Sequence, residues 1–526
     1  MVAASIVALA VQSVVLVAGA WQIGIGWDEV FHVSLDWVQP LYVSHDPGIF
    51  GIYGYSTQYL GHMLNVEFGE EQWLRQYSYT PLAYGIRHLS FAIVGMIGVA
   101  VTGLTAACIT GHRWVGWVSA AMLAAQPLWI GHSMMNPKDI PVAVGYSMFT
   151  AGLVGMVMFR WSRFLPLRVF IAMLFISIGL FSAMGFRLAM AVPLAGTFLV
   201  FVVLQLLRKQ SKENPLKRIA LSLIGVVIGL ALILAANSYL LNYLSVNLFR
   251  SIIFGSGAYP WSGTVLFNGS IVSGADLPRW YWGEVLLLSV PIGIGVLALI
   301  GIVASGRTLY RDIRSAGAKI SRRGAAITLV AMQALTLPII LTITRPVDYD
   351  MQRHHLYVFP AVAVLAGMGV WCLYSVCERR RERGSAGFVW GGRLLVLGVC
   401  LSLLFPVIEG ARLFPYNYVY LNPIASIGGI SGRWETDYWG LSLREAQRHV
   451  PKGAIFTEMG PAYTFDTYRG EQGTGSPIVS IDADHSLIIM MRRADWQLPS
   501  GCVQGFAVVR PLRFEELVLS QVASCP

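Results

Sequence analysis

Three short polar motifs interrupt an otherwise apolar sequence, and they contain residue types that can carry acid–base and anion-binding chemistry. The first is Asp28-Glu29, within Gly26-Trp-Asp-Glu-Val-Phe-His32. A carboxylate within hydrogen-bond reach of a substrate hydroxyl can take its proton as a general base. Two adjacent carboxylates beside an apolar run are costly unless they face water, a cavity or a cation. The alternative is an interfacial pair that merely ends a helix.

The second motif is His132-Ser-Met-Met-Asn-Pro-Lys-Asp139, a compact polar stretch between two apolar runs. Asn136 before Pro137 predicts a turn that aims Lys138 and Asp139 back toward the neighbouring helices. The alternative is that Lys138 and Asp139 pair with each other at the surface.

The third motif is Thr344-Arg-Pro-Val-Asp-Tyr-Asp-Met-Gln-Arg-His-His-Leu-Tyr-Val-Phe-Pro360. It places three basic residues at the start of a late apolar run: Arg353, His354 and His355. Arginine offers a planar fork of donors that suits phosphate oxygens. With Arg187 and Arg345 on the same side, we expect a basic site for an anionic headgroup. The alternative for each arginine is a side chain that snorkels to the membrane surface.

The elements that must position these motifs are membrane spans. The chain has 526 residues, of which 55% are hydrophobic and 13% are charged, with a mean hydropathy of +0.60. A soluble enzyme of this size is far less apolar. The net charge of +10 lies largely in short gaps between apolar runs, so it indicates membrane topology and not nucleic-acid binding.

We predict about eleven transmembrane helices, because each run is long enough to cross about 30 Å of hydrocarbon. The runs begin near Val2, Leu89, Trp114, Pro141, Pro166, Leu188, Ile219, Val285, Ala325, Leu356 and Leu394. The first run leads directly into Trp21 and Trp27, as in an interfacial belt, and a cleaved signal peptide is the alternative.

Positive charge alternates between the gaps and sets the expected orientation. The basic gaps, which the positive-inside rule places in the cytoplasm, include Arg113, Arg168, Arg208, Lys217, Arg311, Arg322 and the 378–383 run. We therefore expect a multi-pass protein of the cell membrane with its N-terminus in the cytoplasm. The extracytoplasmic parts are 27–87, 132–139, 185–187, 242–283, 344–355 and everything after Glu409.

The tail after Glu409 has the pattern of a small extracytoplasmic α/β domain over residues 410–526, following a transmembrane module over 1–409. Ser442 and Glu445 predict a capping box at the start of a helix. Short apolar runs predict strands at 454–456, 478–481, 487–490 and 506–509. Cys502 and Cys525 are predicted to form a disulfide, since they alone among the six cysteines fall outside both membrane and cytoplasm.

Together the motifs resemble those of the GT-C glycosyltransferases, and the most similar set is the bacterial family 39 type. That set is related to protein O-mannosyltransferases and the aminoarabinose transferase of lipid A. The outward Asp-Glu, the Asn-Pro-Lys-Asp loop and the Arg-His-His-Leu-Tyr-Val-Phe-Pro run carry the resemblance. Phe414–Pro423 and Gly432–Ser442 are similar to segments of uncharacterised bacterial members. The histidines at 354 and 355 depart from the family, as does the tail domain.

The resemblance implies an inverting transfer of a sugar from a polyprenyl-phosphate donor to a lipid, glycan or protein acceptor. It implies that Asp28, with Glu29 beside it, acts as or orients the catalytic base, and that Asp139 supports the site. Contacts to the lipid phosphate would come from basic residues: Arg353, Lys138, Arg187, Arg345, His354 and His355.

No oxygen-rich cation cage is evident in the sequence, so we expect catalysis without a metal or other cofactor, a divalent ion at Asp28 being the minority option. Membrane lipids are expected partners and nucleic acid is not. Two other functions stay open. A transporter or flippase would use the same charges along a path, and a non-catalytic assembly subunit would leave Asp28 and Glu29 dispensable.

Overall fold

The structure is a computed structural model that describes residues 1–29, 59–72, 78–159, 165–208, 214–236, 261–314, 320–382, 388–475, 486–491, 493 and 496–526. Ten helices within these ranges are long and apolar enough to cross a membrane. They are α1 (Val2–Gln22), α4 (Pro81–Thr110), α7 (Asp139–Met158), α8 (Leu165–Phe186), α9 (Ala191–Leu207), α10 (Pro215–Ala236), α14 (Ile292–Arg314), α15 (Arg322–Thr344), α16 (Val358–Glu382) and α17 (Phe388–Leu413). The expected helical membrane protein is confirmed.

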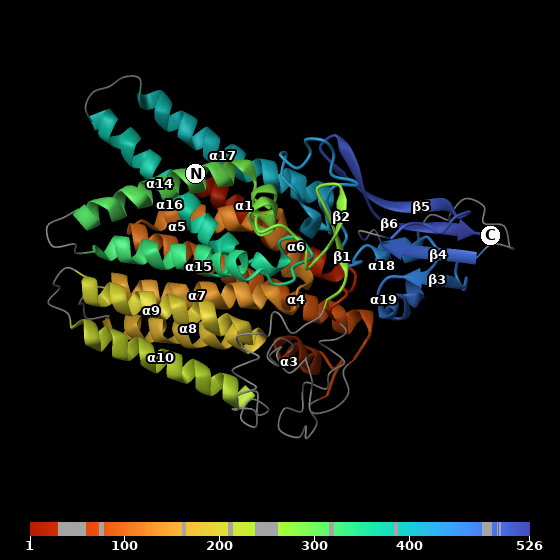
Figure 1. Cartoon of the computed structure of the whole chain (residues 1–526), viewed down its shortest axis with the longest axis horizontal. Helices are drawn as coiled ribbons and strands as arrows, with labels where there is room; N and C mark the ends of the chain where they lie inside the picture. Colours follow the sequence, from red (N-terminus) through yellow and green to blue (C-terminus); the bar gives the residue numbers. More distant parts are fainter. Residues whose placement is uncertain are drawn as a thin grey trace.

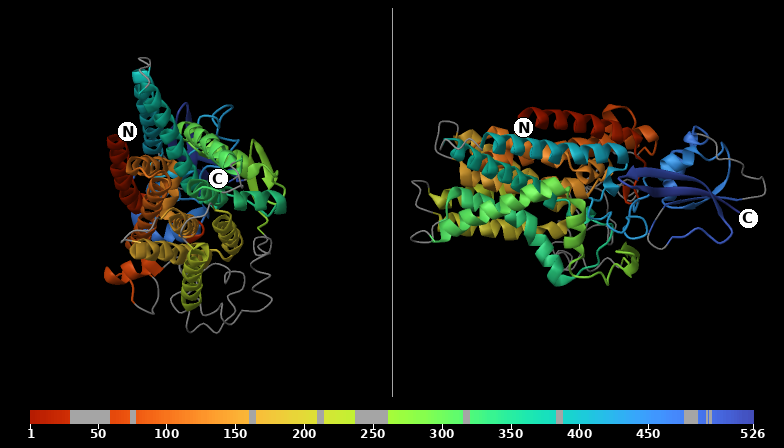
Figure 2. Two further views of the ribbon diagram at one scale, coloured as in Figure 1. Left: turned by 90° about the vertical axis from the view of Figure 1, so that its left-hand side faces the viewer. Right: turned by 90° about the horizontal axis from the view of Figure 1, so that it is seen from above.

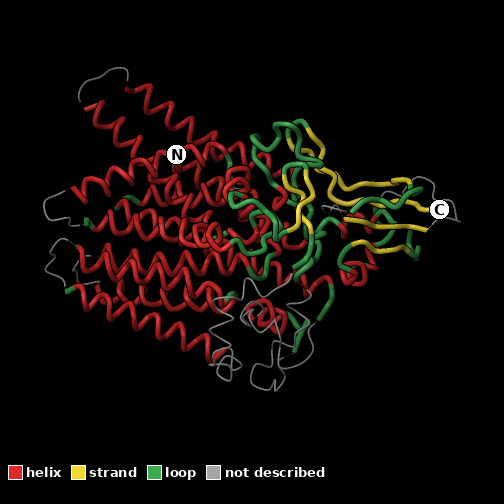
Figure 3. The backbone as a smooth tube through the Cα atoms, in the orientation of Figure 1, coloured by secondary structure: helices red, strands yellow, loops and turns green. Residues whose placement is uncertain are grey.

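The long helices form one bundle, and the strands of the C-terminal segment lie beyond one end of it (Figure 1, Figure 3). We call this end of the bundle the sheet end. Figure 2 shows the same arrangement from two other sides. The connections at 23–29, 136–138, 187 and 345–357 all lie at the sheet end, so the three motifs meet there.

The run expected as a single span from Trp114 is divided. Its first part is α5 (Arg113–Ala124) and its second part is α6 (Pro127–Met135). Proline lacks an N–H and disfavours helical backbone in the residue before it, and Gln126 before Pro127 is extended, with ψ of 113°. The two helices follow one another along α4. Ten long helices and this broken crossing account for the eleven expected runs.

Close contact between α14 and α16 depends on small residues. A Cβ added at Gly301 or Gly369 would lie 1.9 and 2.0 Å from backbone oxygens of the opposite helix, at Leu365 and Leu297. Small residues let helix backbones approach closely in a membrane, where packing and not the hydrophobic effect holds helices together. The α14–α16 contact therefore positions α16, the helix that continues from the third motif.

The C-terminal segment forms a four-stranded sheet with strand order β3-β4-β6-β5. Its strands are β3 (Phe456–Met459), β4 (Ser486–Met491), β5 (Val503–Leu512) and β6 (Glu515–Cys525). Strands β3 and β4 are parallel, and the other pairs are antiparallel. The strands expected at 454–456, 487–490 and 506–509 are confirmed with shifted ends, whereas 478–481 lies outside the described residues.

Two finer predictions for this segment have different outcomes. The disulfide between Cys502 and Cys525 is confirmed. The helix predicted near Ser442 exists as α18 (Leu443–Arg448), but the capping box is wrong. Ser442 has helical backbone angles, φ of −77° and ψ of −9°, where an N-cap residue is normally extended, so its Oγ accepts no N–H of α18 and donates to the carboxylate of buried Asp437.

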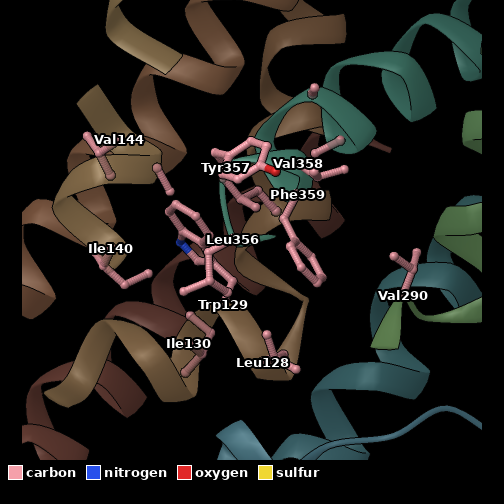
Figure 4. Close-up of a cluster of buried hydrophobic side chains, with 14 of the residues drawn as sticks. Leu128, Trp129, Ile130, Ile140, Val144, Val290, Leu356, Tyr357, Val358 and Phe359 are labelled. Atoms are coloured by element: carbon pink, nitrogen blue, oxygen red, sulfur yellow. The ribbon is translucent and has the colours of Figure 1, made fainter. Parts of the chain in front are cut away.

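An apolar layer lies directly beneath the polar motifs. Figure 4 shows Trp129 and Ile130 of α6, Ile140 of α7 and Leu356 and Phe359 at the beginning of α16 packed together. All five side chains are at most 1% exposed. Because Arg353 and Asp139 are next to this layer in the chain, its packing fixes where their side chains can lie.

Candidate functional site

A network of ion pairs at the sheet end brings the three motifs together, and Arg353 is at its centre. Arg353 Nη1 lies 2.5 Å from Asp28 Oδ2, and its Nη2 lies 3.2 Å from Asp350 Oδ2. Its Nε is 3.8 Å from Asp139 Oδ2. The guanidinium also packs over the ring of Trp439, 4.8 Å from its centroid. Burial by itself would lower the pKa of Arg353, but Asp350 and Asp28 raise it well above its ordinary value, so it remains a cation.

Asp28 is the accessible carboxylate of this network. Its side chain is 25% exposed, while those of Asp139 and Asp350 are 3% exposed. Besides Arg353, Asp28 Oδ2 lies 3.4 Å from Lys138 Nζ. The carboxylate therefore contacts two cations and is the most exposed of the three.

The predicted turn at Asn136-Pro137 positions Lys138 and Asp139. Asn136 Oδ1 accepts hydrogen bonds from the backbone N–H groups of Lys138 and Asp139, at 3.1 and 2.8 Å. This side chain caps α7 as an Asx turn does. Both residues point into the network, so the prediction that the turn aims them inward is confirmed.

Arg187 is the accessible cation of the network. It lies between α8 and the short helix η3 (Leu188–Met190), and its Nη2 is 2.8 Å from Asp139 Oδ1. Its side chain is 22% exposed, against 1% for Arg353. Nε of Arg187 and Nε of Arg353 are both buried and have no hydrogen-bond acceptor among the described protein atoms. The network thus contains two buried N–H donors without an acceptor among these atoms.

His354 and His355 converge on one carboxylate, Asp348. His354 Nδ1 lies 2.9 Å from Asp348 Oδ1, and His355 Nε2 lies 3.0 Å from Asp348 Oδ2. Burial and the adjacent Arg353 lower the pKa of His354 to about 4. The neutral ring donates from Nδ1 to Asp348 and accepts at Nε2 from Arg353, at 3.0 Å.

Asp348 is the anchor of both histidines. Burial raises the pKa of Asp348, but His355 and the hydrogen bonds from both rings hold it below its ordinary range. The carboxylate therefore orients His354, and through it Arg353. His354 contacts Arg353 directly, whereas His355 contacts Asp348 and Tyr357, and binding of phosphate by either ring stays a prediction.

Glu29 faces away from Asp28 and is buried. Its Oε1 accepts the backbone N–H of Gly26 at 2.5 Å, and its Oε2 lies 2.7 Å from His88 Nε2. His88 Nδ1 lies 3.1 Å from the carbonyl oxygen of Ala20, which can only accept, so Nδ1 carries a hydrogen. In this geometry Glu29 shapes the turn that presents Asp28.

Arg345 lies outside the network. It ends α15 with a left-handed backbone, φ of 50°, and its side chain is exposed. It lines a pocket with Arg279, Trp282 and Asp348, the carboxylate that both histidines contact. Among the described residues Arg345 and Arg353 share no ion-pair partner, so the expectation that both bind one phosphate stays a prediction.

Three contributors to the network were not chosen from the sequence: Asp350, Trp439 and Arg493. Asp350 accepts from Trp439 Nε1 at 3.1 Å and pairs with Arg493 Nη2 at 3.2 Å. Asp350 lies within the third motif, so its spacing from Arg353 was a usable signal. Trp439 and Arg493 come from the tail: Trp439 lies within the Gly432–Ser442 segment that carries the resemblance, whereas Arg493 lies in neither of the quoted tail segments. Among the described residues, no group of three or more His, Cys, Asp or Glu side chains is arranged to hold a metal ion.

Comparisons with known proteins find similar structures, but at low sequence identity. No protein-family model and no curated protein matches the chain. The chain is similar to the structure of ArnT from Cupriavidus metallidurans in the apo state, with 13% identity over 99% of this chain and 97% of that chain and a TM-score of 0.49. ArnT bound to undecaprenyl phosphate gives the same identity and coverage, with a TM-score of 0.47.

The chain is also similar to the Archaeoglobus fulgidus oligosaccharyltransferase in its apo form. The identity is 14% over 85% of this chain and 58% of that chain, and the TM-score is 0.48. Likenesses at this level establish no activity, so function must be argued from the site itself.

Proposed function

We propose that this protein is a membrane glycosyltransferase that moves a sugar from a polyprenyl-phosphate donor to a hydroxyl of a lipid, glycan or protein acceptor. One observation carries the proposal. A partly exposed carboxylate, Asp28, lies beside a cluster of cations formed by buried Arg353 and Lys138 and partly exposed Arg187. A base beside an anion-binding cluster is what transfer from a phosphate leaving group needs. The motif resemblance to family 39 enzymes points to the same reaction.

The reaction follows from the positions of these groups. The bond between the anomeric carbon and the phosphate oxygen breaks, and a bond from that carbon to the acceptor oxygen forms on the opposite face, with inversion. Asp28 takes the acceptor proton. The departing phosphate gains charge, which preorganised donors stabilise. Arg187 is the more exposed cation and meets the phosphate first, while Arg353 Nε and Lys138 lie deeper.

The reaction needs the sheet end to face away from the cytoplasm, and charge placement supports that orientation. At the other end of the bundle α5 begins at Arg113, α15 begins at Arg322 and α16 ends after Arg379, Arg380 and Arg381. By the positive-inside rule this basic end is cytoplasmic. The disulfide of the C-terminal segment fits an oxidising outer compartment.

The test uses the purified protein in lipid nanodiscs with a panel of polyprenyl-phosphate sugars. Native mass spectrometry first identifies any donor that co-purifies, and release of free polyprenyl phosphate then measures turnover. Asp28→Asn should reduce release at least about 100-fold while the protein stays folded. Asp276→Asn is the matched control, since Asp276 is exposed in a loop of the same end.

Two results would count against the proposal. Near-normal turnover of Asp28→Asn would remove Asp28 as the base. Movement of intact lipid-linked sugar across the bilayer, without release of polyprenyl phosphate from any donor, would indicate a flippase instead.

A further inference from the structure

The short segment that carries Asp28 is held on one side by the C-terminal segment. Backbone carbonyls of residues 21, 23, 25, 26 and 27 all accept hydrogen bonds from side chains of Arg444, Tyr463 and Thr464. In addition, the N–H of Trp27 donates to the carbonyl of Trp439 at 3.2 Å. The last described turn before Asp28 is thus bonded, residue by residue, to a part of the chain more than 400 positions away.

Arg444 fixes the end of α1. Its Nη1 donates to the carbonyls of Trp21 and Ile23, at 2.9 and 3.1 Å. A cation at the C-terminus of a helix satisfies carbonyls that have no partner within the helix and complements the helix dipole. Arg444 is itself held by Glu471, at 2.7 Å, and packs over the ring of Tyr468. The end of α1 is therefore set by a side chain that cannot easily move.

Tyr463 and Thr464 hold the residues between α1 and Asp28. Both lie on the short helix α19 (Ala462–Thr467). The Tyr463 hydroxyl is 3.1 Å from the carbonyl of Gly26 and also lies within hydrogen-bond distance of that of Trp27. Thr464 Oγ1 lies 3.3 Å from the carbonyl of Ile25. The carbonyl of Trp27 belongs to the peptide group that joins Trp27 to Asp28. Tyr463 therefore holds the peptide group directly before the proposed base.

Two glycines let the segment before Asp28 lie directly against the C-terminal segment. A Cβ added at Gly24 would lie 2.3 Å from the carbonyl oxygen of Leu441, and one at Gly26 would lie 2.7 Å from the ring of Trp439. The segment is therefore pressed against the tail over its whole length. Glu29 and His88 hold its other side.

We infer that Tyr463 is a positioning residue for Asp28, and that the C-terminal segment rigidly supports residues 23–28, which we call the catalytic turn. This inference rests on the proposed function where turnover is measured. Tyr463 touches no substrate in this scheme: it acts by fixing the peptide that carries the base. A base displaced by about 1 Å can lose about 100-fold in rate.

Tyr463→Phe tests the inference, because it removes the hydroxyl and keeps the ring. We expect kcat for release of polyprenyl phosphate to fall about 10- to 100-fold with little change in the donor KM. In the Asp28→Asn background the same change should cause no further loss, since it acts through Asp28. Tyr416→Phe is the matched control, because Tyr416 donates to Glu445 within the C-terminal segment and does not touch residues 21–28. Thr464→Val provides a second, milder variant.

A measurement without turnover separates this inference from the proposed function. In full-length Asp28→Cys, we expect Tyr463→Phe to raise the rate of maleimide labelling at position 28 about 2- to 10-fold, as loss of hydrogen bonds loosens the turn. Peptide mass mapping distinguishes this thiol from the others. An unchanged labelling rate would overturn the positioning role even if the protein transfers sugar. An additional loss from Tyr463→Phe on top of Asp28→Asn would overturn it as well.

Discussion

Lys138 and Asp139 are adjacent in the chain, but they form ion pairs with different partners. Lys138 Nζ lies 3.4 Å from Asp28, whereas Asp139 lies 2.8 Å from Arg187. The alternative in which these two residues merely neutralise each other at the surface is therefore wrong for this structure. One loop links the accessible carboxylate of the site to its accessible cation.

Arginine substitutions should separate donor binding from base positioning. Arg187→Ala should raise the donor KM about 10- to 100-fold, since a charge-assisted hydrogen bond to phosphate is lost. Arg353→Lys should weaken donor binding and also lower kcat, because lysine keeps the charge but loses the fork that holds Asp28. Arg345→Lys, outside the network, is the control. Carrier-lipid binding as tight as wild type in both Arg187→Ala and Arg353→Lys would place the phosphate elsewhere.

Glu29→Gln should be mild. The glutamine amide can accept from Gly26 N–H with its oxygen and donate from its NH₂ to a neutral His88, so the turn keeps both contacts. Glu29→Ala should cost about 2 to 3 kcal/mol of stability, because it leaves buried polar groups unpaired. Turnover and Tm of the two variants check this. A loss of turnover in Glu29→Gln equal to that in Asp28→Asn would make Glu29 catalytic.

Gly26→Ala should displace the catalytic turn, since its Cβ would meet the ring of Trp439 at 2.7 Å. We expect at least about 10-fold lower turnover, with the protein still inserted in the membrane. Gly283→Ala is the matched control, because a Cβ at Gly283 meets nothing within 4 Å. Equal turnover of the two variants would contradict the tight fit.

Acid should destabilise the site through His354. Its pKa is about 4 in the folded protein and about 6.5 in the unfolded chain. Between these values the unfolded chain binds more protons, so the free energy of unfolding falls as the pH drops from about 6.5 toward 4. At pH 5 the expected loss is about 2 kcal/mol. His354→Gln should show a smaller fall in Tm between pH 7 and pH 5, and an unchanged fall would refute the assignment.

Removing the disulfide should weaken the support of the catalytic turn. Cys502 and Cys525 are 23 positions apart, and closing such a loop contributes about 2 to 4 kcal/mol. Cys525→Ser should therefore lower the Tm, while Cys377→Ser, which replaces a free cysteine, should not. Peptide mapping without reduction should recover the 502–525 crosslink. Recovery of both cysteines as free thiols would contradict the bond.

Much of the fold follows from composition and from where apolar runs stop. Membrane helices satisfy their own backbone groups, so length and hydropathy suffice to find them. The break between α5 and α6 follows from Pro127, a local signal within an apolar run. Ser442 does not cap α18 because its own backbone is already helical, with ψ of −9°, and the sequence pattern alone does not show that conformation.

The site was partly predictable for a different reason. Charged residues beside apolar runs are few, so Asp28, Lys138, Asp139, Arg187 and Arg353 stood out by type and place. Their pairing spans as many as 325 positions, and only the folded chain shows it. Residue type could not tell that Glu29 turns inward. Trp439 and Tyr463 are ordinary aromatic residues of the tail, and their roles arise only from contact.

The bonds between the tail and the catalytic turn impose an order of events during synthesis. Trp27 and Asp28 leave the ribosome early, whereas Tyr463, which bonds to the carbonyl of Trp27, follows 436 positions after Trp27. At about 5 to 20 residues per second this delay is about 20 to 90 s. His88 and Lys138, which pair with Glu29 and Asp28, are made well within that interval, whereas the hydrogen bonds from Tyr463 form last. A chain interrupted before residue 463 would lack the support that completes the turn before Asp28, so the proposed activity should require about the last eighth of the polypeptide.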